Sequence, residues 1–130
     1  MLPRNRLFIA MALAYALLGG LLGLAWLADP AAFSPLALRA HAHLMLVGFV
    51  GMMIFGVGLH VLPRFTGHNL FSERLADAQF WLANGGLLAM VAGWLLSVPF
   101  LVYVGGPTLW LALAVFALNV TATVRPWARR

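Results

Sequence analysis

Long runs of apolar residues alternate along the chain with short segments rich in proline, glycine and charged residues. The runs cover residues 7–28, 36–62, 75–96 and 100–124. Each is long enough to cross a hydrocarbon core of about 30 Å, because a helix rises about 1.5 Å per residue. The pattern predicts an all-α integral membrane protein, in which residues 1–130 form a single domain with a four-transmembrane-helix bundle.

Proline and polar residues mark the ends of these predicted helices. Asp29 and Pro30 are expected to end the first helix, and Pro63 the second, because proline cannot continue the hydrogen-bond ladder. Ser72, followed by Glu73, is a candidate cap for the third helix. The first run resembles a signal peptide, but its apolar core is too long and lacks a clear cleavage site. We therefore expect it to be retained as a span.

Composition agrees with a membrane protein and narrows its chemistry. The 130 residues are 64% hydrophobic and 8% charged, whereas soluble domains are about half apolar and about a quarter charged. The eight basic residues are all arginine, and the net charge is +5. They lie at the ends of the runs, which favours lipid headgroups over nucleic acid as partners. The absence of cysteine excludes disulfides, thiolate metal sites and covalently attached haem.

The arginines also predict an orientation in the membrane. All but one lie on the same side of a four-span chain: Arg4, Arg6, Arg64, Arg74, Arg125, Arg129 and Arg130. The positive-inside rule then places both termini and the middle connection in the cytoplasm, for a multi-pass protein of the cell's inner (cytoplasmic) membrane. Arg39 lies on the opposite side, so His41 and His43 fall in the outer half of the bilayer and His60 near the cytoplasmic face.

Two histidines near the start of the second predicted helix are the main candidate site, because ionisable side chains inside a membrane are costly. His41 and His43 are about 200° apart on a helix and cannot both bind one iron from one side. A zinc or copper site needs three or four converging ligands, which this region does not supply. Haem needs one or two axial ligands and a flat apolar slot, which Gly48 and neighbouring glycines permit. Alternatively, the imidazoles only form hydrogen bonds with Asn84, itself a candidate for an interhelical bond, or with backbone carbonyls.

Other residues have more than one interpretation. Arg39 either pairs with a haem carboxylate or anchors the helix end at the headgroups. His60 lies about 25 Å from His43 along the helix and binds a second haem, meets a lipid headgroup, or forms a hydrogen bond within the cytoplasmic loop. Gly19 and Gly23 form a G-x-x-x-G pair, which lets another helix approach closely or reflects the abundance of glycine in membrane helices.

Several motifs carry a resemblance to a known family. They are His41-Ala42-His43, Gly48-Phe49, Gly56-Val57-Gly58, Leu62-Pro63-Arg64-Phe65-Thr66-Gly67 and Phe80-Trp81-Leu82. Residues 39–82 resemble the second and third membrane helices of subunit I of the haem-copper oxidases and nitric-oxide reductases. They are also similar to small membrane proteins related to that subunit, and to the histidine-rich segment of a nitric-oxide-response membrane haem protein family.

The resemblance implies a haem b cofactor bound through the second helix. In the large subunit a histidine early in this helix is an axial ligand of a low-spin haem, so that role falls on His41 or His43. The His-Ala-x-x-Met pattern favours His41, whereas the spacing to Gly48 and Phe49 allows His43.

Four histidines and three acidic residues are too few for a complete oxidase or reductase. Only the second helix carries histidine, so we expect a homodimer or a partner membrane subunit to supply a second ligand. The predicted function is electron transfer or binding of a diatomic gas (NO or O2), with the lipid bilayer and a quinol or a redox protein as further partners. The alternative is a cofactor-free accessory or assembly subunit. A self-sufficient quinol oxidase or nitric-oxide reductase is disfavoured, because no pair of titratable groups offers acid–base catalysis.

Overall fold

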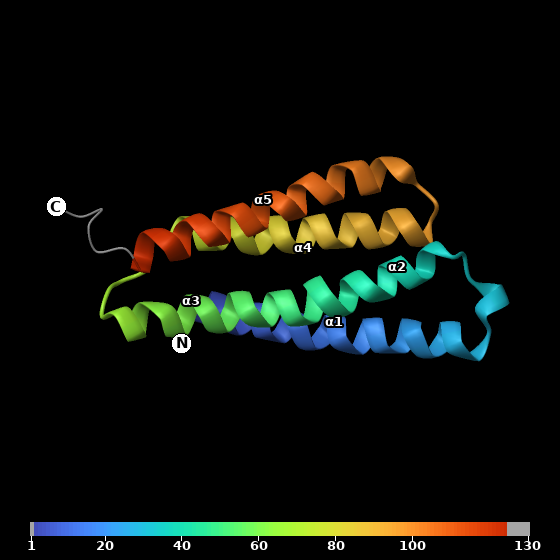
Figure 1. Ribbon diagram of the computed structural model, residues 1–130, viewed down its shortest axis with the longest axis horizontal. Coiled ribbons are helices and arrows are strands. Elements are labelled where there is room, and N and C mark those ends of the chain that lie inside the picture. Colours follow the sequence, from blue (N-terminus) through green and yellow to red (C-terminus); the bar gives the residue numbers. More distant parts are fainter. Residues whose placement is uncertain (1, 125–130) are drawn as a thin grey trace.

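The computed structural model describes residues 2–124 and is built from helices (Figure 1). The α-helices are α1 (Pro3–Ala28), α2 (Leu36–His43), α3 (Met52–Thr66), α4 (Glu73–Leu95) and α5 (Pro99–Val124). A short 3-10 turn, η1 (Pro30–Ala32), follows α1, and a π-helical segment, η2 (Leu44–Gly51), joins α2 to α3 without a break. Residues 2–124 contain no strand, and the predicted all-α class is confirmed.

The helices run up and down as two hairpins (Figure 1). In one hairpin α1 packs against the continuous α2–η2–α3 helix, and in the other α4 packs against α5. The connection through η1 and the α4–α5 turn lie at one end of the molecule. The α3–α4 connection lies at the other end, near the start of α1. Short connections of this kind make consecutive helices antiparallel neighbours.

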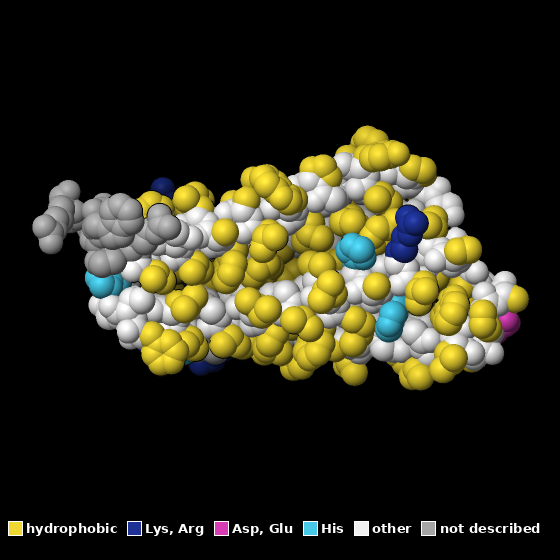
Figure 2. Space-filling model, viewed as in Figure 1, with side chains coloured by type: hydrophobic (Ala, Val, Ile, Leu, Met, Phe, Trp, Pro, Cys, Tyr) yellow, Lys and Arg dark blue, Asp and Glu magenta, His cyan; other side chains and the backbone are white. Residues whose placement is uncertain are grey.

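Within the described residues, three helices are long and apolar enough to cross a membrane: α1, the continuous helix of residues 36–66, and α5. Helix α4 is less apolar, because it begins at Glu73 and buries Gln79 and Asn84. Hydrophobic side chains cover most of the face seen in Figure 2. These are the properties of a membrane protein.

The helix ends are defined by capping groups. The Ser72 side chain accepts a hydrogen bond from the first turn of α4, as predicted. The predicted end of the second helix at Pro63 is wrong, because α3 continues through Thr66 and stops at Gly67, whose φ is 67°. Pro63 removes only one backbone donor, and the helix continues past it. In the last turn, the Thr66 hydroxyl donates to the carbonyl of Leu62 at 3.1 Å. The left-handed conformation of Gly67 is the usual way to end a helix.

Glycines allow the closest helix contacts. Between α4 and α5, a Cβ on Gly86 would lie 2.7 Å from the backbone nitrogen of Leu109, and one on Gly105 would lie 2.7 Å from the carbonyl oxygen of Gly86. In the other hairpin, a Cβ on Gly19 would lie 2.9 Å from Sδ of Met45. The second helix therefore packs closely on the G-x-x-x-G pair of α1, as one of the two interpretations predicted.

Polar contacts join the two hairpins. The Tyr15 hydroxyl donates a buried hydrogen bond of 2.7 Å to Oδ1 of Asn84, which confirms an interhelical role for this asparagine. At the end near the start of α1, the Arg4 guanidinium forms ion pairs with Glu73 at 2.7 Å and with Asp77 at 2.9 Å. These contacts hold α1 beside α4, although the two helices belong to different hairpins.

Candidate functional site

His41, on α2, lies against α1. Its Nδ1 is 2.7 Å from the carbonyl oxygen of Gly19, and its ring covers Gly23, where a Cβ would lie 2.7 Å from the imidazole Cε1. A carbonyl oxygen only accepts, so Nδ1 carries the proton and Nε2 keeps the lone pair. Histidines that bind metals usually make such an outer hydrogen bond, because it fixes the tautomer and the orientation of the ring.

His43 has the same hydrogen-bond pattern but faces α4. Its Nδ1 donates to the carbonyl oxygen of Arg39 at 3.1 Å. Its ring packs on Trp94, with 4.6 Å between the ring centroids and an angle of 60° between the planes. His41 and His43 therefore contact different neighbouring helices, as their separation of about 200° predicts.

The Nε2 atoms of both histidines are free. Neither forms a hydrogen bond among residues 2–124, and neither is among the buried unpaired side-chain atoms of that part of the chain. Each Nε2 therefore reaches the molecular surface, and histidine side chains are visible over α2 in Figure 2, beside a basic side chain. If the histidines served only packing, their expected hydrogen-bond partners were backbone carbonyls or Asn84. Both Nδ1 atoms bond to backbone carbonyls, as this alternative predicts, whereas Asn84 bonds to Tyr15.

Arg39 is exposed next to this pair. It lines a cavity of about 280 Å³ together with Trp94, Ser97 and Tyr103. Ser97 has a φ of 56°, in the left-handed region, at the turn between α4 and α5. A guanidinium at this position is available to a carboxylate or a phosphate at the surface.

Gly48 does not border either imidazole. It is buried where α1 crosses η2, and a Cβ there would lie 2.7 Å from Cβ of Tyr15 and 3.0 Å from Leu87. The flat space predicted at this glycine is thus filled by side chains of the same chain.

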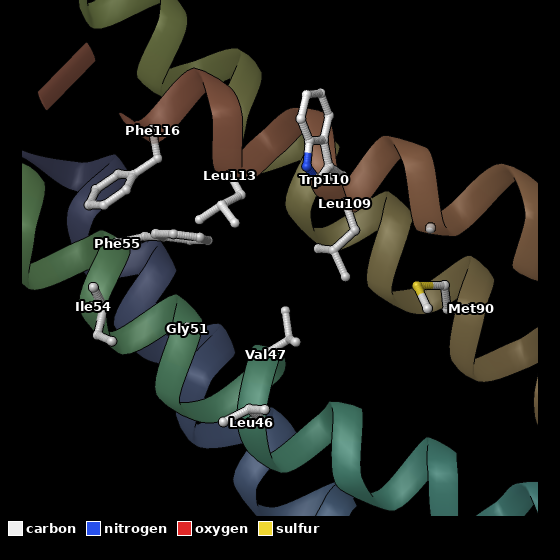
Figure 3. A pocket seen from close by; sticks show the side chains of 11 residues that line it. Leu46, Val47, Gly51, Ile54, Phe55, Met90, Leu109, Trp110, Leu113 and Phe116 are labelled. Atoms are coloured by element: carbon white, nitrogen blue, oxygen red, sulfur yellow. The ribbon is translucent and has the colours of Figure 1, made fainter. Parts of the chain in front are cut away.

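The bundle has an apolar cavity of about 410 Å³ between α5 and the η2–α3 segment. Figure 3 shows Val47, Phe55 and Leu109 pointing toward one another across it. The residues that line it are Leu46, Val47, Gly51, Ile54, Phe55, Met90, Gly106, Leu109, Trp110, Leu113 and Phe116. Neither His41 nor His43 borders this space, so it offers no axial ligand.

The third predicted candidate, His60, lies near the opposite end of the continuous helix. It borders a separate cavity of about 350 Å³, together with Arg64 and Asn69. The structure does not bring His60 close to His41 or His43, in agreement with the separation of about 25 Å between His60 and His43 along the helix.

The available donors fit single axial ligation better than a bare metal ion. Residues 2–124 contain no group of three or more histidine, cysteine or acidic side chains able to hold a metal. His41 and His43 each present one unprotonated Nε2 at the surface, and an imidazole nitrogen is one of the donors that hold haem iron in proteins.

Two contacts of the site were not predicted from the sequence: the Gly19 carbonyl with His41, and Trp94 with His43. The Gly19 carbonyl could have been suspected from the G-x-x-x-G pair, because glycine exposes its backbone to a neighbouring helix. Trp94 carries no such signal, since nothing in its local sequence indicates that it faces His43.

Comparison with known proteins identifies the family. The family described as cytochrome c and quinol oxidase polypeptide I matches residues 5–99, which run from the first turn of α1 to the end of α4 and include both histidines of α2. No curated protein and no solved structure matches the chain. The predicted relation to subunit I of the haem-copper oxidases is confirmed, and the match extends it beyond residues 39–82. The chain therefore belongs to the family of subunit I of the cytochrome c and quinol oxidases.

Proposed function

We propose that this protein is a membrane haem b-binding subunit that transfers electrons or binds a diatomic gas such as NO or O2. One observation carries the proposal: the Nδ1–H of His41 is held by the Gly19 carbonyl at 2.7 Å, which leaves Nε2 free at the surface. This is the arrangement of an imidazole prepared for an axial bond. When bound, haem b supplies one-electron chemistry and an iron for gas ligands.

His41 is the proposed axial ligand, and His43 the second choice. His41 belongs to the His-Ala-x-x-Met pattern that resembles the ligand helix of subunit I, and its ring is fixed against a neighbouring helix. The ring of His43 is held only by its hydrogen bond within α2 and by its tilted contact with Trp94. Arg39 lies one turn before His43, on the face of α2 that turns toward Trp94, and is the proposed partner of a haem carboxylate for a cofactor bound at His43.

The second axial position requires another chain. Because Nε2 of His41 opens to the outside, the bound cofactor would lie against the outer face of α1 and α2. A second copy, related by twofold symmetry, would cover it and present its own histidine. A partner membrane subunit with an exposed ligand would serve equally, and a quinol or a redox protein would exchange electrons.

We also propose that α4 spans the membrane together with the three more apolar helices, so that residues 1–130 form one four-helix domain. The start of α4 lies beside the start of α1, because Arg4 pairs with Glu73 and Asp77. With the arginines at this end, both termini and the α3–α4 connection would face the cytoplasm, in the inner (cytoplasmic) membrane.

A cofactor-free accessory subunit is the second candidate function. It is favoured by the tight contacts of both rings, His41 on Gly23 and His43 on Trp94, which would also suit histidines used only for packing. In that case the free Nε2 atoms would bond to a partner subunit.

The optical spectrum of the detergent-purified protein, expressed with sufficient haem, tests the proposal. We expect Soret and α bands after reduction, a loss of the six-coordinate spectrum in His41→Ala, and its retention in His43→Ala. His68→Ala, in the α3–α4 connection, is the control. A reduced protein without these bands contradicts haem binding, and six-coordinate spectra in both α2 variants contradict the choice of ligands. Native mass spectrometry showing only monomers would contradict ligation between two copies.

A further inference from the structure

The polar cavity of about 350 Å³ at the end of the molecule far from His41 and His43 has no part in the proposed haem site. It is enclosed by the start of α1, the last turns of α3 and the α3–α4 connection, through Asn5, His60, Arg64 and Asn69. We propose that it binds the phosphate group of an anionic phospholipid.

Donors from different elements face this cavity. Arg64 and His60 are one turn apart on α3, and Asn69 comes from the α3–α4 connection. Arg64 forms no ion pair with another residue among residues 2–124. A guanidinium with further N–H donors around it is the usual arrangement for holding the oxygens of a phosphate.

Asn5 supplies the observation that points to a ligand. Its side chain is buried, with 1% of the residue exposed, and it borders the cavity. Its only hydrogen bond within the described residues uses Oδ1, which accepts from Nη2 of Arg4 at 3.3 Å. The Nδ2 donors form no hydrogen bond to these residues, and Nδ2 is not among their buried unpaired atoms, so it is open to the cavity and can donate to an oxygen that enters it.

The electrostatics favour an anion. Glu73 is the acidic residue that borders the cavity, and its carboxylate is already paired with Arg4 at 2.7 Å. Helix α1 begins beside the cavity without a side-chain cap, so its positive dipole end is uncompensated there. Arg64 is therefore the cation of the cavity lining that forms no ion pair within residues 2–124, and it remains available to an anion.

The position of the cavity selects a lipid as the source of the phosphate. Leu2, Leu59 and Leu70 complete its walls, so a headgroup inside it remains in contact with apolar side chains. The cavity lies where α1 begins and α3 ends, which is headgroup level on the cytoplasmic side in the proposed orientation. Anionic lipids are abundant in that leaflet, and basic pockets between membrane helices bind their headgroups.

Native mass spectrometry of the full chain, purified in detergent, tests the proposal with phosphatidylglycerol and phosphatidylcholine as probes. We expect the wild type to retain phosphatidylglycerol preferentially, and Arg64→Gln to weaken this binding about fivefold. Arg74→Gln removes the same charge from an exposed residue at the same end, outside the cavity, and should bind like the wild type. Asn69→Ala, in the exposed connection, should also weaken binding and is a second test if Arg64→Gln fails to fold.

Further measurements identify the source of the phosphate. Displacement of the lipid by millimolar inorganic phosphate would assign the site to a soluble phosphate and overturn the choice of a lipid. Equal retention of the two lipids, or equal losses in Arg64→Gln and Arg74→Gln, would overturn the proposal itself. Retention of an added quinone in an Arg64-dependent manner, without a lipid preference, would also overturn it. All these measurements are independent of haem content, so their failure is distinct from a failure of the proposed haem site.

Discussion

The imidazole of His41 rests on Gly23 of α1, and a Cβ at that glycine would lie 2.7 Å from Cε1 of the ring. A methyl group there must displace the ring and weaken its hydrogen bond to the Gly19 carbonyl. Two residues separated in sequence by the η1 connection thus determine together how one candidate ligand is oriented.

Gly23→Ala is therefore expected to weaken haem binding about fivefold, the effect of about 1 kcal/mol, the lower end of overpacking costs, because the imidazole can shift. Gly20→Ala is the matched control, because a Cβ at Gly20 meets nothing within 4 Å. Haem content and the reduced spectrum are measured in both variants at equal protein concentration. Identical spectra in the two variants would show that Gly23 does not hold the ring.

The α4–α5 contact is expected to be the least tolerant of added bulk. A Cβ on Gly86 or Gly105 would lie 2.7 Å from backbone atoms, which cannot rotate away as a side chain can. We expect Gly86→Ala and Gly105→Ala each to lower the free energy of unfolding by about 1–3 kcal/mol. Gly85→Ala and Gly106→Ala, where a Cβ meets nothing within 4 Å, should be neutral or slightly stabilising. Unfolding in mixed micelles, followed by circular dichroism, distinguishes these pairs, and equal stabilities would contradict the close backbone approach.

Tyr15→Phe removes the buried hydrogen bond of 2.7 Å to Asn84 and leaves Oδ1 of Asn84 without its donor. Double-mutant cycles on membrane helices give such bonds about 0.6 kcal/mol on average and about 1.7 kcal/mol at most, and we expect a destabilisation in this range. Tyr103→Phe is the control, because Tyr103 is 77% exposed. A Tyr15→Phe variant as stable as the control would mean that Asn84 finds another donor.

Arg4→Gln breaks the ion pairs with Glu73 and Asp77. The carboxylate side chains are 54% and 60% exposed, so solvent screening limits the loss to about 0.2–1 kcal/mol. The difference from wild type should shrink in high salt, since exposed ion pairs are screened. Arg6→Gln, an exposed neighbour without an ion pair among residues 2–124, is the control. A loss that does not change with salt would contradict an electrostatic origin.

The helices could be predicted because long apolar runs have few other stable structures, and the ends marked by Asp29 and Ser72 agree with the structure. The end at Pro63 was mispredicted, since the sequence does not show that the helix continues after one missing donor. The π-helical segment η2 was not foreseen. It lies where Tyr15 meets Gly48, a contact between distant segments that local composition does not encode.

The histidines of α2 could be identified as candidates because polar residues in an apolar run are conspicuous. Their partners were harder to predict: the Gly19 carbonyl depends on the docking of α2 on α1, and Trp94 on which face of α4 turns toward α2. The expectation that Gly48 opens a slot overlooked Tyr15, because only the packed structure shows which side chain fills the space beside a glycine.

The continuous helix of residues 36–66 has 31 residues, whereas α4 has 23. At about 1.5 Å per residue these helices are about 46 Å and about 35 Å long, against a hydrocarbon thickness of about 30 Å. The longer helix must tilt or project beyond the hydrocarbon, as expected for hydrophobic mismatch. In an upright helix centred on the bilayer at Gly51, His41 would lie about 15 Å from the centre, at the boundary between acyl chains and headgroups. In that placement the thickness of the host membrane would set the polarity around His41, and a thinner bilayer would move its imidazole into the headgroup layer.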